Sequence, residues 1–423
     1  MAWSTWTAAI AVAVAAQAVS GARAARGDDT PRPVSAEVRA AVRDYLEAPP
    51  KKEAAALSKA LALLKDDVAL AAEALRSHAP LSKGKPGATH GISFESGGQS
   101  WEYSVLLPKD YDGKRRFPVL VLPDHGSVSP EDGIGFWEGK DGVDEYVVFR
   151  PVITKFQEDK KRFPDQQFFA RDQAIARVME DALAHLRLHY AVDPDRFSMT
   201  GLSQAGYYTW YYAVTFPDAF AGVVPESSGG VGVRAAVLPL ARNLASVAVR
   251  ILHAEGDQVC PYADAKAMRD AIASANGKVD LVTYTDADYS GAPFPKRHPG
   301  PHDKRLANVL PWGVTVRREI PRSFTRVIRY ATQGFEGRFR IPPPEKVEKA
   351  FTVACEEKDG VLSADHAGVS YLVSPEDVVA RRVFKVSGRE VTPKADVKLL
   401  LTSFKSHGDT GRLAAAEIRV TAP

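Results

Sequence analysis

The sequence predicts an α/β fold: a doubly wound, mostly parallel sheet with an N-terminal helical prefix and a small C-terminal all-β domain. Short apolar runs alternate with helix-like runs through the middle of the chain, which is typical of a parallel sheet with helices on both faces. A helical pattern precedes this region, and short strand-like runs separated by turn residues follow it. With 45% hydrophobic and 25% charged residues, the 423-residue chain has the composition of a globular protein.

The charge and the cysteine content restrict the classes of function. A net charge of +3 is close to neutral for this length and indicates neither a nucleic-acid partner nor an anionic membrane surface. The two cysteines, Cys260 and Cys355, would either pair or stay free, which geometry decides. No cysteine and histidine cluster has zinc-site spacing, so we expect no metal and no cofactor.

The first 24 residues have the pattern of a secretory signal peptide. The apolar core at residues 7–19 is too short to span a bilayer comfortably. Ala-Arg-Ala at residues 22–24 is a cleavage-site pattern. Because no Lys or Arg precedes the apolar core, an uncleaved anchor is the alternative. In either case we expect a secreted or periplasmic body with no further membrane contact.

The remaining chain divides by composition. We predict a linker at 25–34, a helical segment at 35–87, a catalytic domain at 88–335, a Pro-rich linker at 336–345 and a β accessory domain at 346–423. In the helical segment, Leu57, Leu61, Leu64 and Val68 recur on one face of a helix. The strands expected in the central domain are 101–108, 117–123, 146–151, a run ending at Gly201, 220–225, 247–253 and 279–285. Those expected in the accessory domain are 351–354, 370–373, 383–386, 397–401 and 418–420.

A serine lies at the junction of one predicted strand with a helix. Ser203 follows Gly201 and precedes Ala205 and Gly206. In the G-x-S-x-G nucleophile elbow, small residues on both sides of the serine let strand and helix pass closely and expose its hydroxyl. Here the last position is Ala, with Gly one residue later. The alternative is an ordinary turn built from small residues.

A base and an orienting acid would follow in order. Asp257 lies in the loop after the strand at 247–253, and His298 and His302 lie in the loop after the strand at 279–285. A serine nucleophile needs a base that an acid orients. The order Ser, Asp, His is that of α/β-hydrolase triads.

Three stretches carry a resemblance to a family. They are residues 103–123, the VDPDR segment at 192–196 that leads to the Ser203 turn, and the D-x-V-x-P turn that begins at Asp257. Together they resemble the α/β-hydrolase superfamily, and within it the secreted carboxylesterases of feruloyl-esterase-like and polyhydroxybutyrate-depolymerase-like type. The resemblance covers residues 90–335. It implies Ser203 as nucleophile, Asp257 as orienting acid and a histidine of the following loop as base.

Two loop histidines compete for the role of base. His302 is favoured because it stands at the edge of a predicted helix over 303–312, whereas His298, between prolines, is the alternative. His253 precedes Asp257 and is interpreted as a strand-end residue. A base near the ordinary histidine pKa of about 6.5 predicts that activity falls below neutral pH.

The oxyanion would be held by backbone N–H groups. Gln204, directly after the nucleophile, is one predicted donor. The other is expected from Gly126 or Ser127, because Asp-His-Gly at 124–126 resembles the family's His-Gly step.

The sequence predicts the substrate only by class. We expect a small-molecule or polymer-linked carboxylic ester, cleaved through an acyl-enzyme. The aromatic residues near the predicted site would either contact substrate or belong to the core; they are Phe136, Trp137, Tyr207, Tyr208 and Trp210. Glu226 is interpreted as a solvated loop residue, with a role in the pocket as the alternative. A prolyl-oligopeptidase-type peptidase and a non-catalytic, hydrolase-like binding protein are the alternative functions.

Overall fold

The computed structural model describes residues 33–124, 128–152, 168–289, 298, 302–330, 333–344 and 349–420. The chain separates into two compact units, Met1–Pro33 and Val34–Pro423. The predicted signal peptide and most of the linker after it lie outside the described residues. None of the described helices combines the length and the hydropathy that a membrane-spanning segment needs.

The body opens with three helices, α1 (Ala36–Glu47), α2 (Pro50–Leu64) and α3 (Val68–Arg76). The side chain of Ser35 caps α1, and that of Asp67 caps α3. The single helical face predicted from Leu57 to Val68 is wrong in one respect. The chain turns at Lys65 and Asp66, which have φ of +48° and +58°, so α2 ends at Leu64 and Val68 begins α3.

An eight-stranded sheet forms the centre, in the order β1-β2-β4-β3-β5-β6-β7-β8. Its strands are β1 (Gly87–Ser96), β2 (Gln99–Leu107), β3 (Phe117–Val121), β4 (Val147–Val152), β5 (Val192–Leu202), β6 (Gly222–Glu226), β7 (Ala248–Ala254) and β8 (Val279–Tyr284). β2 pairs antiparallel with β1 and β4, and every other neighbouring pair is parallel. The predicted mostly parallel sheet is confirmed. Its carboxyl edge brings together the loops after β3, β5, β7 and β8.

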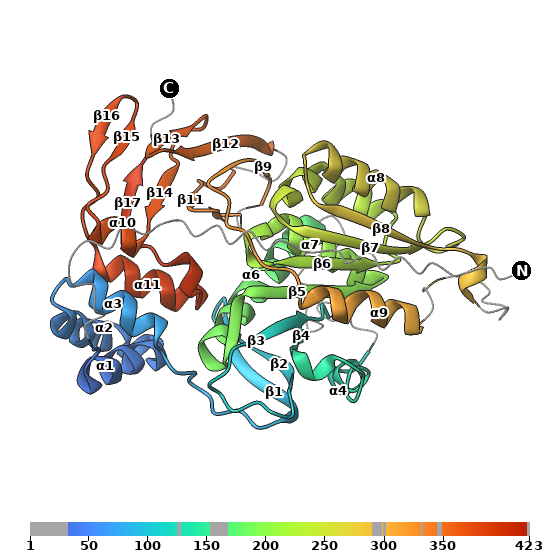
Figure 1. Cartoon of the computed structure of the whole chain (residues 1–423), viewed down its shortest axis with the longest axis horizontal. Coiled ribbons are helices and arrows are strands. Elements are labelled where there is room, and N and C mark those ends of the chain that lie inside the picture. Colours follow the sequence, from blue (N-terminus) through green and yellow to red (C-terminus); the bar gives the residue numbers. More distant parts are fainter. Residues whose placement is uncertain are drawn as a thin grey trace, which may run out of the picture. The chain divides into compact units, whose positions relative to one another are not determined.

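Helices cover both faces of this sheet (Figure 1). They are α4 (Pro130–Gly135), α6 (Phe168–His189), α7 (Gln204–Thr215), α8 (Tyr262–Ser274) and α9 (His302–Gly313), with short helical turns η1 (Val143–Glu145), η3 (Pro217–Ala219), η4 (Val233–Val237), η5 (Leu238–Ser246) and η6 (Asp286–Tyr289). On one face, Val121 and Val223 belong to a core with α6, α7 and α8. On the other, Leu120 and Val224 pack in a core with α4 and α9. Neighbouring strand residues therefore enter opposite cores, as a doubly covered sheet requires.

The C-terminal part contains two further sheets. Their strands are β9 (Ser323–Ile328), β10 (Phe335–Glu336), β11 (Phe339–Arg340), β12 (Phe351–Lys358), β13 (Val361–Ala364), β14 (Ser370–Val373), β15 (Phe384–Val386), β16 (Arg389–Val391) and β17 (Ala416–Arg419). The orders are β10-β11-β14-β17 and β16-β15-β13-β12-β9. β9, which precedes the predicted linker at 336–345, pairs with β12.

One strand predicted in this part is wrong. Residues 397–401 belong to helix α11 (Val397–His407), which Asp396 caps by accepting a hydrogen bond from the Leu399 N–H. Its buried residues recur at helical spacing; they are Val397, Leu400, Leu401 and Phe404. These side chains share a core with α1–α3, so the helical prefix packs against a helix from the other end of the chain. Two shorter helical pieces, α10 (Pro375–Val379) and η8 (Thr410–Arg412), complete this part.

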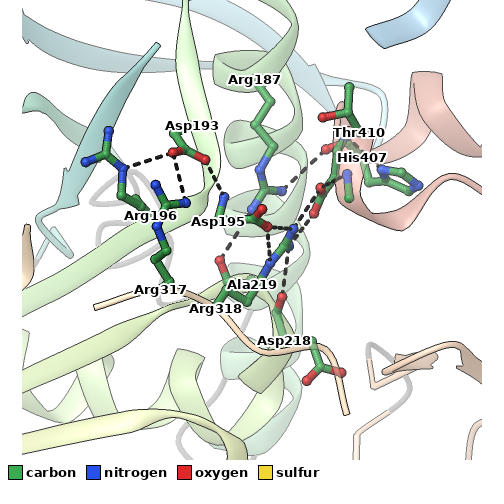
Figure 2. A network of polar contacts seen from close by, with 12 residues as sticks. Arg187, Asp193, Asp195, Arg196, Asp218, Ala219, Arg317, Arg318, His407 and Thr410 are labelled. Carbon is green, nitrogen blue, oxygen red and sulfur yellow. Dashed lines mark hydrogen bonds and ion pairs between the residues drawn. The ribbon is translucent and has the colours of Figure 1, made fainter. Parts of the chain in front are cut away.

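A buried ionic network connects the C-terminal part of the chain to the central sheet (Figure 2). The guanidinium of Arg318 lies between the carboxylates of Asp195, at 2.7 Å, and Asp409, at 3.0 Å. It also donates to the carbonyl oxygen of Asp218, at 3.1 Å. Because Asp195 belongs to β5 and Asp409 follows α11, Arg318 connects the central sheet to the C-terminal helix.

No disulfide joins the two cysteines. Cys355 is buried in β12, and Cys260 is half-buried in the loop after β7.

Candidate active site

Ser203 lies at the sharp turn between β5, which ends at Leu202, and α7, which begins at Gln204. Its φ of +57° and ψ of −115° are rarely adopted by a residue with a side chain. The surrounding structure enforces this conformation: the Ser203 N–H donates to the carbonyl oxygen of Glu226 at 2.9 Å. A strained backbone at a strand-to-helix junction is the geometry of a nucleophile elbow.

Close backbone contacts require small residues around Ser203. A Cβ on Gly201 would come within 2.5 Å of the carbonyl oxygen of Ala205. A Cβ on Gly206 would come within 2.8 Å of the Glu226 carbonyl oxygen and 2.9 Å of that of Gly201. The shift from G-x-S-x-G to G-x-S-x-A-G is therefore compatible with the turn, because the closest approach after the serine falls on Gly206.

Asp257 follows the end of β7 at Ala254, and its side chain is fully buried. Its Oδ1 accepts hydrogen bonds from the N–H groups of Val259 and Cys260, at 2.8 and 2.9 Å. Its Oδ2 accepts one from Nδ1 of His298 at 2.8 Å. Burial raises the pKa of Asp257, but the hydrogen bonds from His298 and from the two backbone N–H groups outweigh burial and bring the pKa below its usual value. The carboxyl is therefore ionised at neutral pH and can orient a histidine.

His298 is a histidine whose ring is hydrogen-bonded to Asp257. An ionised carboxylate only accepts hydrogen bonds, so the proton of the His298 ring lies on Nδ1. This leaves Nε2 as the basic nitrogen. The side chain is 13% exposed, which keeps the ring reachable. His302 is the first residue of α9, four positions further on, and its side chain is not among those described.

His253 also lies next to Asp257, with Nε2 3.5 Å from Oδ2. That nitrogen donates to the carbonyl oxygen of Cys260 at 2.9 Å, and the side chain is fully buried. Burial lowers the pKa of His253, so its ring is neutral. It sits at the end of β7, as predicted, and its side chain is enclosed beside Asp257.

The predicted oxyanion donors are only partly described. Gln204 is the first residue of α7, where a helix N–H has no partner within the helix. Gly126 and Ser127 lie outside the described residues. Both flanks of that gap are held by Arg150 of β4, which donates to Asp124 Oδ1 at 2.8 Å and to the carbonyl oxygen of Val128 at 2.7 Å. Arg150 and Asp124 are 3% and 5% exposed, so the anchor is buried.

Glu226 is not a solvated loop residue, which corrects the prediction. It ends β6, is 2% exposed, and pairs with Nε of Arg305. Thr200 Oγ1 donates to its other carboxylate oxygen at 2.8 Å. Because Arg305 belongs to α9, this buried pair connects the strands beneath Ser203 to the helix that follows His298.

Sequence reasoning missed Arg150 and Arg305. Arg150 stood inside an otherwise apolar predicted strand, which was the available signal. A charged residue in a buried strand needs a partner. Here the partners are Asp124 Oδ1 and the carbonyl oxygen of Val128.

The predicted aromatic residues divide between core and surface. Tyr208, Trp210 and Trp137 are 3%, 1% and 6% exposed and belong to the core. Tyr207 is half-buried beside Gly232, and Phe136 is 38% exposed. Only the last two remain available to a ligand. Within the described ranges, no group of three or more His, Cys, Asp or Glu side chains is arranged to hold a metal ion.

Comparisons with known proteins give short or partial likenesses. No protein-family model matches the sequence. Over 59 residues, the chain is 34% identical to poly(3-hydroxyalkanoate) depolymerase C of Paucimonas lemoignei, which is 14% of each protein. A thermostable esterase of known structure aligns with 54% of this chain and 62% of its own, at 20% identity and a TM-score of 0.38. Dipeptidyl peptidase 4 of Porphyromonas gingivalis aligns with 54% of this chain and 35% of its own, at 14% identity and a TM-score of 0.41.

The chain thus spans less than two thirds of each of these proteins. The fold is evident from the chain itself. A mostly parallel eight-stranded sheet is covered on both faces, a strained serine turn follows β5, and a carboxylate loop follows β7. The chain has the α/β-hydrolase fold.

Proposed function

We propose that the protein is a serine hydrolase that cleaves carboxylic esters, with Ser203 as nucleophile, His298 as base and Asp257 as orienting acid. The observation that carries this proposal is the 2.8 Å hydrogen bond between His298 Nδ1 and the buried Asp257 carboxylate. It prepares one ring nitrogen, Nε2, to accept a proton. This bond lies at the same edge of the sheet as the strained turn of Ser203, which favours a catalytic role for the histidine over a purely structural one.

In the proposed reaction, neutral His298 takes the proton of the Ser203 hydroxyl. The serine oxygen attacks the ester carbonyl, and the N–H of Gln204, with a second donor from Gly126 or Ser127, stabilises the oxyanion. Each such donor contributes roughly 3–4 kcal/mol in related sites. His298 then gives its proton to the leaving alcohol, which leaves an acyl group on Ser203. Water, activated by the same histidine, releases the acid.

The protein would act outside the cytoplasm if residues 1–24 serve as a signal peptide. Its partner would be a small-molecule or polymer-linked ester, and we propose no nucleic-acid partner, because the net charge is only +3. The likeness to a depolymerase named for a polyester supports an ester over an amide as the bond cleaved.

The test is hydrolysis of p-nitrophenyl acetate and p-nitrophenyl butyrate by the wild type and by Ser203→Ala. We expect turnover that Ser203→Ala abolishes, and covalent labelling of Ser203 by a fluorophosphonate. An aminoacyl p-nitroanilide serves as the peptidase control. Cleavage of the anilide in preference to both esters would overturn the ester assignment, and a folded wild type without labelling or turnover would overturn the hydrolase.

A further inference from the structure

A cavity of about 330 Å³ lies far from the proposed active site. Its walls come from the end of α3, the loop before β3, the junction of α6 with β5, and the segment after α11. Val192 and Pro194, at the amino end of β5, line it, whereas Ser203 follows the carboxyl end of the same strand. An 11-residue strand separates its ends by roughly 30 Å. The cavity is therefore a separate site.

The charged residues that line this cavity are all cationic. They are Arg76, Lys114, Arg116 and Arg187, joined by His78, and no Asp or Glu is among the lining residues. Arg76 pairs with Glu376. The ion pairs found among the described residues include none from Lys114, Arg116 or Arg187. The cavity thus carries an excess of positive charge in a protein whose overall charge is near neutral.

The hydrogen bonds of the two unpaired arginines go to neutral oxygens. Arg116 donates to the Arg76 carbonyl oxygen at 3.1 Å and contacts Thr410 Oγ1 at 3.5 Å. Arg187 donates to the carbonyl oxygens of His407 and Ala219, at 3.3 and 3.5 Å. Apart from the bond of 3.1 Å, these contacts are long and therefore weak, and none of the four acceptors is charged, so each guanidinium can also bind a charged acceptor.

Two buried nitrogens of the lining lack a partner. Within the described ranges, neither Nε2 of His78 nor Nε of Arg187 has a hydrogen-bond acceptor or donor. Burial lowers the pKa of Arg187 to about 10, against the influence of Asp409. Burial, with Arg43 and Arg116, also lowers the pKa of His78 to about 4, against the Leu188 carbonyl and Glu47. Burial therefore disfavours the charged form of both side chains, and the nearby negative charge does not fully offset it.

The rest of the lining is apolar, and the volume limits the size of an occupant. Leu75, Tyr190 and Phe404 contribute hydrophobic surface beside the cations. Ligand pockets occupy about 300–1,000 Å³, so this cavity has the volume for a small molecule. We propose that this cavity binds a small organic anion, whose phosphate or carboxylate group is held by Arg116, Lys114 and Arg187 and whose ring or chain contacts the apolar wall.

The test uses calorimetric titration of the whole protein at low salt with phenyl phosphate, phenylacetate and benzyl alcohol. The first two probes separate a phosphate from a carboxylate head group, and the third carries the ring without charge. We expect at least one anion to bind and the alcohol not to bind. Arg116→Gln and Lys114→Gln should each weaken binding by about 10-fold or more, as loss of a charged hydrogen bond does.

The matched control is Arg115→Gln, in the same loop. Arg115 is exposed, pairs with Asp110 at 2.5 Å, and does not line the cavity, so its loss should change affinity less than about twofold. Lys114 and Arg116 are exposed, so all three variants are expected to fold. Three results would overturn the site: no heat from either anion, equal binding of benzyl alcohol, or wild-type affinity in both cavity variants. Ser203→Ala should bind as the wild type does, which separates this proposal from the ester-hydrolase proposal.

Discussion

The Asp257 carboxylate accepts a hydrogen bond of 2.8 Å from Nδ1 of His298, a residue 41 positions further along the chain. The same carboxylate has His253 on its other side, at 3.5 Å. Of these two histidines, His298 combines the contact with an accessible ring, whereas Nε2 of His253 bonds to the Cys260 carbonyl oxygen and its side chain is fully buried. This contact leads us to propose His298 as the base. Single variants of His298 and His302 test that proposal.

Replacing His298, the proposed base, should remove nearly all activity, and replacing His302 should not. His298→Ala should lower kcat/KM for p-nitrophenyl butyrate by roughly 10⁴-fold, because the serine loses its proton acceptor. His302→Ala should stay within about threefold of the wild type. Steady-state kinetics of both variants, with circular dichroism as the folding check, decide the matter. The reverse pattern would return the role of base to His302.

Arg150 should affect the rate through the loop that it anchors. Arg150→Lys keeps the charge but cannot donate to Asp124 and the Val128 carbonyl oxygen in the same fork geometry. If the loop at 125–127 supplies an oxyanion donor, kcat should fall on the order of 10²-fold with a smaller change in KM.

The control for Arg150 is Arg177→Gln, an exposed arginine of α6 that pairs with Asp181 at 3.2 Å. It should leave kcat unchanged. A folded Arg150→Lys protein with wild-type kcat would show that this anchor does not position the oxyanion site.

The Glu226–Arg305 pair should stabilise the fold and the position of α9. Arg305→Met leaves a carboxylate buried at 2% exposure without its partner, so the free energy of unfolding should fall by about 3–5 kcal/mol. Activity should fall as well, because α9 begins four residues after His298. Urea denaturation and ester kinetics measure the two effects.

Two variants sharpen the test of this pair. Lys304→Gln, on the same helix, removes a half-exposed pair with Asp288 and should cost less than about 1 kcal/mol. Glu226→Gln combined with Arg305→Met should recover part of the loss, because no unpaired charge remains buried. Equal stability of Arg305→Met and the wild type would contradict the assigned role.

The network around Arg318 should make the protein sensitive to acid. Burial raises the pKa of Asp409, but Arg318 and Arg187 outweigh burial and hold it well below its usual value. A carboxyl with a lowered pKa contributes stability that is fully present above the ordinary aspartate pKa of about 3.9 and is lost as the pH falls below it.

Asp409→Asn should therefore lower the free energy of unfolding by about 3–5 kcal/mol at pH 7, since it leaves Arg318 buried without this charge. It should also flatten the loss of stability between pH 5 and pH 3. Urea denaturation across that range tests both expectations. An unchanged slope would mean that other carboxyl groups govern acid unfolding.

Local sequence patterns determined most of the fold. Alternating apolar runs predicted the parallel strands from residue 117 to residue 285, and the small residues around Ser203 predicted the strained turn that β5 and α7 form. These features depend on neighbours in the chain, because periodicity and steric size act over a few residues. The same kind of signal was present but misinterpreted at 397–401, where buried residues three and four apart form a helix.

Only the tertiary structure decided which distant groups meet. The sequence favoured His302, whose side chain is not among those described, whereas the described contact of Asp257 with a histidine of this loop is that of His298. Arg150 beside Asp124, Arg305 beside Glu226 and Arg318 beside Asp409 are likewise pairs between separate elements. A buried charge must find its partner in space, and spacing along the chain does not encode where the folded backbone brings that partner.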